Sequence, residues 1–77
     1  MHKKERKELA RKIEALIIAV PRESAAYDYY MELADQFDDP SSKDMFVFLA
    51  KQEKMHREKL EELITKLEEK LQKLQDQ

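Results

Sequence analysis

The chain has 77 residues, of which 42% are charged, and its formal net charge is -2. It contains no glycine and only two prolines, so the sequence predicts long helices joined by one turn. The absence of cysteine excludes a disulfide framework, a thiolate zinc site and a cysteine nucleophile. Acidic and basic residues are interleaved along the chain, which argues against the segregated basic surface of a nucleic-acid-binding protein.

The distribution of charge also bears on location. The longest uncharged stretch, residues 15–21, is far too short to cross a bilayer, so we expect no membrane partner. Residues 1–4 lead into a charged segment rather than the apolar core of a signal peptide. We therefore expect a cytoplasmic protein.

The first predicted helix covers about residues 3–37. Pro21 lies inside it, and a proline within a helix removes one backbone donor and crowds the preceding turn. This residue therefore either kinks the helix or splits it into two. The apolar repeat passes through Pro21 without losing phase, which favours a kink.

A turn is predicted at residues 38–41, where aspartate, proline and serine gather. Pro40 disfavours the helical conformation at the residue before it. Ser41 or Ser42 then offers an N-cap for a second helix over about residues 42–75. We treat the chain, residues 1–77, as a single domain made of an antiparallel two-helix hairpin.

Both helices carry apolar positions at alternating spacings of three and four, the pattern of helices that pack in a bundle. The first series is Leu9, Ile13, Leu16, Val20, Glu23, Tyr27, Tyr30, Ala34 and Phe37. The second series is Phe46, Leu49, Glu53, His56, Leu60, Leu63, Leu67, Lys70 and Leu74. Additional apolar residues widen both stripes, and a wide stripe implies more than one neighbouring helix. The hairpin is therefore expected to need a partner.

Before the terminal Lys70, only three positions in these series, Glu23, Glu53 and His56, carry side chains that are ionisable near neutral pH. A carboxylate in a bundle core costs on the order of several kcal/mol unless it is neutralised, paired or bound to a metal. Glu53 and His56 are one turn apart on one helix face. Antiparallel pairing about Pro40 places Glu23 at the same level. Two carboxylates and an imidazole suit iron, manganese or zinc.

Each of these residues also has a simpler interpretation. A single glutamate at such a position often reaches water at the edge of a bundle, and a single histidine often forms a core hydrogen bond. The polar residues would then only set the register of a non-catalytic helical oligomerisation module. Tyr27 and Tyr30 follow Glu23 on its stripe, and they are either core aromatics or hydrogen-bond donors to a ligand carboxylate.

The number of ligands is informative, because two glutamates and one histidine are too few for two metal ions. A twofold axis through the site would double the set to four glutamates and two histidines, which is the ligand set of a di-metal carboxylate centre in a four-helix bundle. The wide apolar stripe and the incomplete ligand set therefore both predict a homodimer or a higher even-numbered oligomer.

Residues 13–63 resemble the rubrerythrin and ferritin-like family, especially its half-length members of the encapsulated-ferritin type, which have two helices per subunit. In that family a tyrosine follows the first-helix glutamate by seven residues, as Tyr30 follows Glu23, and the next helix carries Glu-x-x-His, as at Glu53 and His56. The resemblance implies a dimer that forms a ferritin-like four-helix bundle with two irons, for which manganese or zinc are possible substitutes. It also implies an encapsulin shell as a candidate partner and a protein nanocompartment as an alternative location.

The resulting functional prediction is a di-iron oxidoreductase of the ferroxidase type. Fe(II) would be oxidised with dioxygen or peroxide at a site shared between subunits, with Glu23, Glu53 and His56 as ligands. The alternatives are rubrerythrin-like peroxide reduction, metal binding or storage without turnover, and the non-catalytic oligomerisation module.

Overall fold

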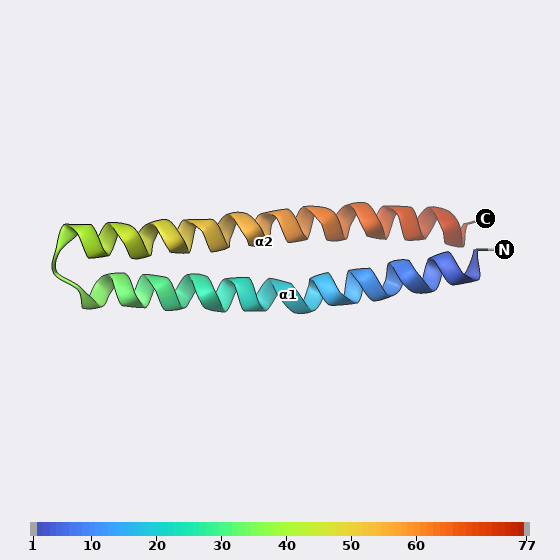
Figure 1. Cartoon of the computed structure of the whole chain (residues 1–77). Helices are drawn as coiled ribbons and strands as arrows, with labels where there is room; N and C mark the ends of the chain where they lie inside the picture. The colour runs from blue at the N-terminus through green and yellow to red at the C-terminus, as the bar shows by residue number, and fades with distance from the viewer. Residues whose placement is uncertain (1, 77) are drawn as a thin grey trace.

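The structure is a computed structural model, and it describes residues 2–76. Two antiparallel helices, α1 (Lys3–Gln36) and α2 (Pro40–Gln75), form a hairpin that measures 60 × 14 × 11 Å (Figure 1). Figure 1 shows the N- and C-termini at the same end of this hairpin, opposite the turn. The predicted all-α hairpin is confirmed. Within residues 2–76, neither helix has a stretch long and apolar enough to cross a membrane.

Helix α1 is continuous through Pro21, so the alternative in which this proline splits the helix is wrong. The helix ends at Gln36, one residue before the predicted end, because the next residue, Phe37, has extended backbone angles of φ -110° and ψ 137°. The side chain of Phe37 still contributes to the hairpin, since its ring stacks on Phe46 of α2 with a centroid distance of 5.4 Å.

Helix α2 begins at Pro40, two residues earlier than predicted, and the expected cap by Ser41 or Ser42 is wrong. Asp39 is the N-cap: its backbone is extended, and its carboxylate accepts a hydrogen bond of 2.9 Å from the backbone N–H of Ser42. Proline suits the first helical position because the N–H that it lacks would have no partner there. Hydrogen bonding from Ser42, by its side chain and by its backbone N–H, lowers the pKa of Asp39.

The turn is also closed by a contact between the two helices. The ammonium group of Lys43 in α2 donates a hydrogen bond of 2.9 Å to the backbone carbonyl of Ala34, in the last turn of α1. The last carbonyl groups of a helix lack partners within the helix, and they carry the negative end of its dipole. Lys43 donates a hydrogen bond to one of these carbonyl groups, and its positive charge interacts favourably with the negative end of the dipole. The contact also links the end of α1 to the start of α2.

The hairpin has very little interior. Among residues 2–76 the buried apolar side chains are Leu9, Ile13, Ala34 and Ala50. Large apolar side chains remain at least 39% exposed at Ile17, Ile18, Tyr29, Phe37, Met45, Phe48 and Met55. Two helices alone cannot enclose these side chains, and small chains with so little buried area usually need a staple or a partner. The exposed apolar surface supports the expectation of oligomerisation, and a homodimer remains a prediction.

Candidate metal centre

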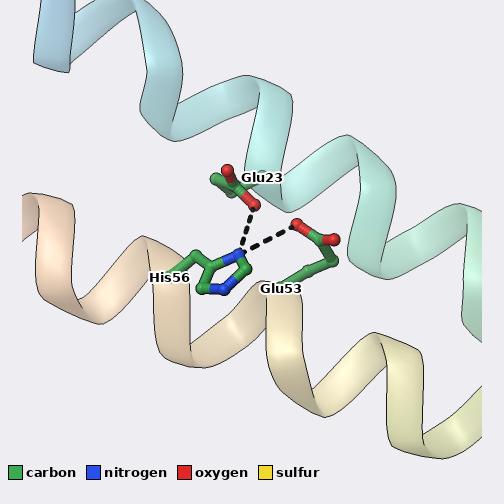
Figure 2. Close-up of side chains that lie close together, drawn as sticks. All are labelled: Glu23, Glu53 and His56. Carbon is green, nitrogen blue, oxygen red and sulfur yellow. Dashed lines mark ion pairs between the residues drawn. The ribbon is translucent and has the colours of Figure 1, made fainter.

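The three ionisable side chains singled out in the sequence lie together between the helices. Glu23 comes from α1, two residues after Pro21, while Glu53 and His56 come from successive turns of α2 (Figure 2). Nδ1 of His56 lies 3.5 Å from Oε2 of Glu23 and 3.6 Å from Oε2 of Glu53. Each of the three residues offers one ligand atom, and these three atoms all lie within 4.8 Å of one another.

The two carboxylates and the imidazole differ in their exposure. The side chains of Glu23 and Glu53 are 25% and 21% exposed, whereas that of His56 is 58% exposed. The carboxylates are thus partly enclosed by the two helices, and the imidazole stands at the edge of the hairpin. A group of ligands that opens on one side in this way is suited to completion by a second chain.

The two carboxyl groups perturb each other. A hydrogen bond with Glu23, partial burial and the negative charge of Glu23 raise the pKa of Glu53, while His56 acts in the opposite direction. Oε2 of Glu23 is buried and has no hydrogen-bond partner among the described residues, although Nδ1 of His56 lies 3.5 Å away. Two facing carboxylates, one with a buried unpaired oxygen, form a site that a cation would stabilise.

The donor set itself indicates which ions fit. Carboxylate oxygens with an imidazole nitrogen are typical ligands of iron, manganese and zinc. Glu23, Glu53 and His56 provide at least one donor atom each, which suits one ion per chain and leaves part of its coordination shell open. The role of these residues as ligands remains a proposal, but their side chains meet as that role requires.

The two tyrosines expected near the site occupy different surroundings. A cavity beside the site is lined by Glu23, Glu53 and Tyr27. The ring of Tyr30 instead lies beside the ring of Tyr29, with 5.7 Å between the ring centroids. Within residues 2–76, neither Tyr27 nor Tyr30 donates a recorded hydrogen bond to a site carboxylate. Their proposed role as donors to ligand carboxylates therefore stays a prediction.

Three further polar residues, Ser24, Lys54 and Arg57, line this cavity, and the sequence analysis did not identify them. The cavity has a volume of about 160 Å³, and both Glu23 and Glu53 form part of its wall. Each of the three follows a proposed ligand directly in the sequence. Nη1 of Arg57 donates a hydrogen bond of 3.3 Å to Oγ of Ser24 on the other helix. Antiparallel pairing about Pro40 places residue 57 roughly opposite Glu23, and this register was the signal in the sequence that could have revealed the contact.

Comparison with known protein families gives a match over most of the chain. The sequence model of the family described as Rubrerythrin matches residues 14–77, which include all of the proposed ligands. No curated protein and no solved structure matches the chain.

Proposed function

Because the chain belongs to the rubrerythrin family, we propose that it is a di-iron carboxylate protein whose metal centre is completed by dimerisation. The observation that carries this proposal is the convergence of Glu23, Glu53 and His56, from two helices, on one group of ligand atoms within 4.8 Å.

The residues present fit this metal. A buried, unpaired oxygen of Glu23 and a raised pKa at Glu53 both reflect negative charge that lacks a counter-charge, which a dication supplies. Two copies of the chain related by a twofold axis would supply four glutamates and two histidines, the set found in di-iron bundles. The exposed imidazole of His56 and the exposed apolar side chains favour such a pairing.

The activity that we propose is ferroxidase-type oxidation of Fe(II) by dioxygen or peroxide. When bound, iron supplies electrons to the oxidant by cycling between its ferrous and ferric forms. Glu23 and Glu53 would hold the ions and balance their charge, and His56 would contribute a nitrogen donor. Partial enclosure of the carboxylates between the helices limits the access of water to the ions.

Reduction of peroxide is a second candidate, and the family match favours it. The two activities differ in the role of iron: in the first Fe(II) is a substrate that is consumed, and in the second the iron stays bound while an external donor returns the electrons. Metal storage without turnover and a helical oligomerisation module are the non-enzymatic alternatives.

Anaerobic titration with Fe(II), followed by addition of oxygen or hydrogen peroxide, tests these functions. We expect binding to saturate at about one Fe(II) per chain, with ferric absorbance after the oxidant is added. Continued oxidation of excess Fe(II) identifies a ferroxidase, whereas a single oxidation that a reductant resets identifies peroxide reduction. Binding without oxidation indicates storage, and the absence of binding leaves the oligomerisation module.

A further inference from the structure

Two buried polar atoms beside the candidate metal centre lack hydrogen-bond partners, and they belong to groups of opposite charge. Among the described residues they are Oε2 of Glu23, an acceptor, and Nε of Arg57, a donor. Both residues line the same cavity of about 160 Å³. Antiparallel pairing about Pro40 places residue 57 roughly opposite Glu23. An anion and a cation at one level of the hairpin, each with a buried atom that lacks a partner, are suited to pair with each other.

The structure shows Arg57 held away from this pairing by two neighbours. Its Nη1 atom donates the hydrogen bond to Oγ of Ser24 on α1, and its Nε atom lies 3.2 Å from Oε1 of Glu61, one turn further along α2. Within residues 2–76, the ion pair of Arg57 is with Glu61, and none joins it to Glu23. The carboxylate of Glu23 is therefore left to the group that it forms with the other two proposed ligands.

The side chain of Arg57 has a second position within reach. It is 42% exposed, so packing does not lock it in one conformer, and the cavity provides space beside the carboxylates. Ser24 directly follows Glu23 in α1, so a change of conformer can move the guanidinium from the hydroxyl to the carboxylate. Pairs of guanidinium and carboxylate are among the stronger hydrogen-bonded contacts, and the two atoms without partners could then bond to each other.

This second position matters most when no metal is bound. The negative charge of Glu23 contributes to the raised pKa of Glu53, which reflects two facing carboxylates without a sufficient counter-charge. A guanidinium at Glu23 supplies that counter-charge in the metal-free protein. A dication at the same carboxylate repels the guanidinium and returns it to Ser24 and Glu61. The metal ion and Arg57 are thus competitors for one carboxylate.

We propose that Arg57 is the counter-cation of the metal-free site: it pairs with Glu23 until an ion binds, and Ser24 and Glu61 then hold it back. This inference rests on the proposed di-metal function, because the ion is the competitor. Arg57 and Ser24 are positioning residues, since they act through a ligand. Their recorded contacts lie within one hairpin, so they do not depend on which flank a partner covers.

The experiment uses the full chain and Co(II), whose visible absorption reports binding, together with thermal melts of the metal-free protein in chelator. We expect Arg57→Gln to bind Co(II) about tenfold more tightly, because a competing contact between charged groups is lost. The same variant should melt at a lower temperature without metal, because the facing carboxylates lose their counter-charge. A residue that only braced the two helices would lower both the affinity and the melting temperature when replaced.

Lys54→Gln is the matched control, since it removes the same charge from an exposed residue that lines the same cavity. An exposed charge that makes no specific contact has a small effect, so Co(II) binding should tighten by no more than about threefold. The metal-free melting temperature of Lys54→Gln should stay nearly unchanged. The difference between the two variants isolates the specific pairing of Arg57 from the general effect of positive charge.

Ser24→Ala tests the restraint on Arg57 without changing any charge. Loss of the hydroxyl releases the guanidinium toward Glu23, so Co(II) binding should weaken by about fivefold, the effect of one hydrogen bond. The same substitution should have no effect on Co(II) affinity in an Arg57→Gln background, because nothing is left to restrain.

Two results would overturn the counter-cation and leave the di-metal function standing. One is a Co(II) affinity in Arg57→Gln no higher than in Lys54→Gln, and the other is an effect of Ser24→Ala that persists without Arg57. Failure of the unchanged protein to bind Co(II) would overturn the di-metal function, and the role of Arg57 with it.

Discussion

Nδ1 of His56 lies 3.5 Å from Oε2 of Glu23, a contact that joins the middle of one helix to the middle of the other. This contact depends on the register of the hairpin, because a shift of one residue would rotate either side chain by about 100° around its helix. Any change that alters the register or the charge of this pair is expected to affect metal binding before it affects the fold.

Replacement of a ligand is expected to separate stability from metal binding. Glu53→Leu and His56→Leu should each abolish metal-dependent stabilisation and iron oxidation. Metal-free Glu53→Leu should be equally stable or more stable, by an amount on the order of 1 kcal/mol, because an apolar side chain replaces one of two facing carboxylates. Metal-free His56→Leu should differ little in stability, because the imidazole is 58% exposed. Thermal melts with and without metal, together with oxidation assays, measure both effects.

Glu23→Ala should behave in the same way, although this residue lies on the other helix. Glu32→Ala is the matched control, since Glu32 is an exposed glutamate on α1 outside the site, and it should change neither property. Iron oxidation that survives the loss of Glu23, or the combined loss of Glu53 and His56, would refute the proposed ligand set.

Metal is expected to stabilise the assembled protein. An ion bound only by the folded state adds about 2.7 kcal/mol at a free concentration 100-fold above its Kd. Melting temperatures should therefore rise with Fe(II), Mn(II) or Zn(II) and fall again with a chelator. Identical melting curves in metal and in chelator would count against a shared carboxylate site.

The isolated chain is expected to form a dimer or a higher even-numbered oligomer at micromolar concentration. Met45 is 52% exposed and lies three turns before His56 at nearly the same angle around α2, so Met45→Glu should weaken association by about tenfold or more. Lys51→Glu, at an exposed position about 120° further around the helix, is the control and should leave association nearly unchanged. Sedimentation that shows a folded monomer in the unchanged protein would contradict this prediction.

The N-cap of α2 is expected to make stability depend on pH in the acid range. The pKa of Asp39 is lowered in the folded state, so its contribution is complete above its ordinary value of 3.8 and is lost as the pH falls through the folded pKa. Asparagine caps helices about as well and does not titrate. As the pH falls below 3.8, the melting temperature of Asp39→Asn should therefore rise relative to that of the unchanged protein.

Asp38→Asn is the control for this pH effect, because Asp38 is an exposed aspartate next to the cap with no capping contact in the structure. Its stability relative to the unchanged protein should vary less with pH. A second variant, Asp39→Ala, removes the cap altogether and should lower the melting temperature at neutral pH.

Much of the fold could be predicted from the sequence, because two regular helices of similar length joined by one turn can pair in few ways. The rise per residue is the same in both helices, so the position of the turn near Pro40 was enough to place Glu23 level with His56. The distance of 3.5 Å between these side chains agrees with that reasoning. The family resemblance was also confirmed by the match to residues 14–77.

Two details were beyond the reach of the sequence pattern. Asp39, Ser41 and Ser42 are all suitable N-caps whose preferences differ little, so local chemistry did not decide where α2 begins. The cavity could not be predicted from periodicity either, because it depends on the conformer of Arg57. Long side chains have many conformers, and the contact with Ser24 on the other helix selects among them.

Ala50 is completely buried one turn before Glu53, and its small size has a consequence for the metal centre. A methyl group allows the two helix backbones to approach closely at this level, as small residues do wherever helices pack tightly. The separation of the backbones in turn sets how far Glu23 and Glu53 would have to extend to share one ion in the proposed site. We therefore expect a bulkier residue 50 to move the two carboxylates apart and to shift the preference of that site toward larger ions.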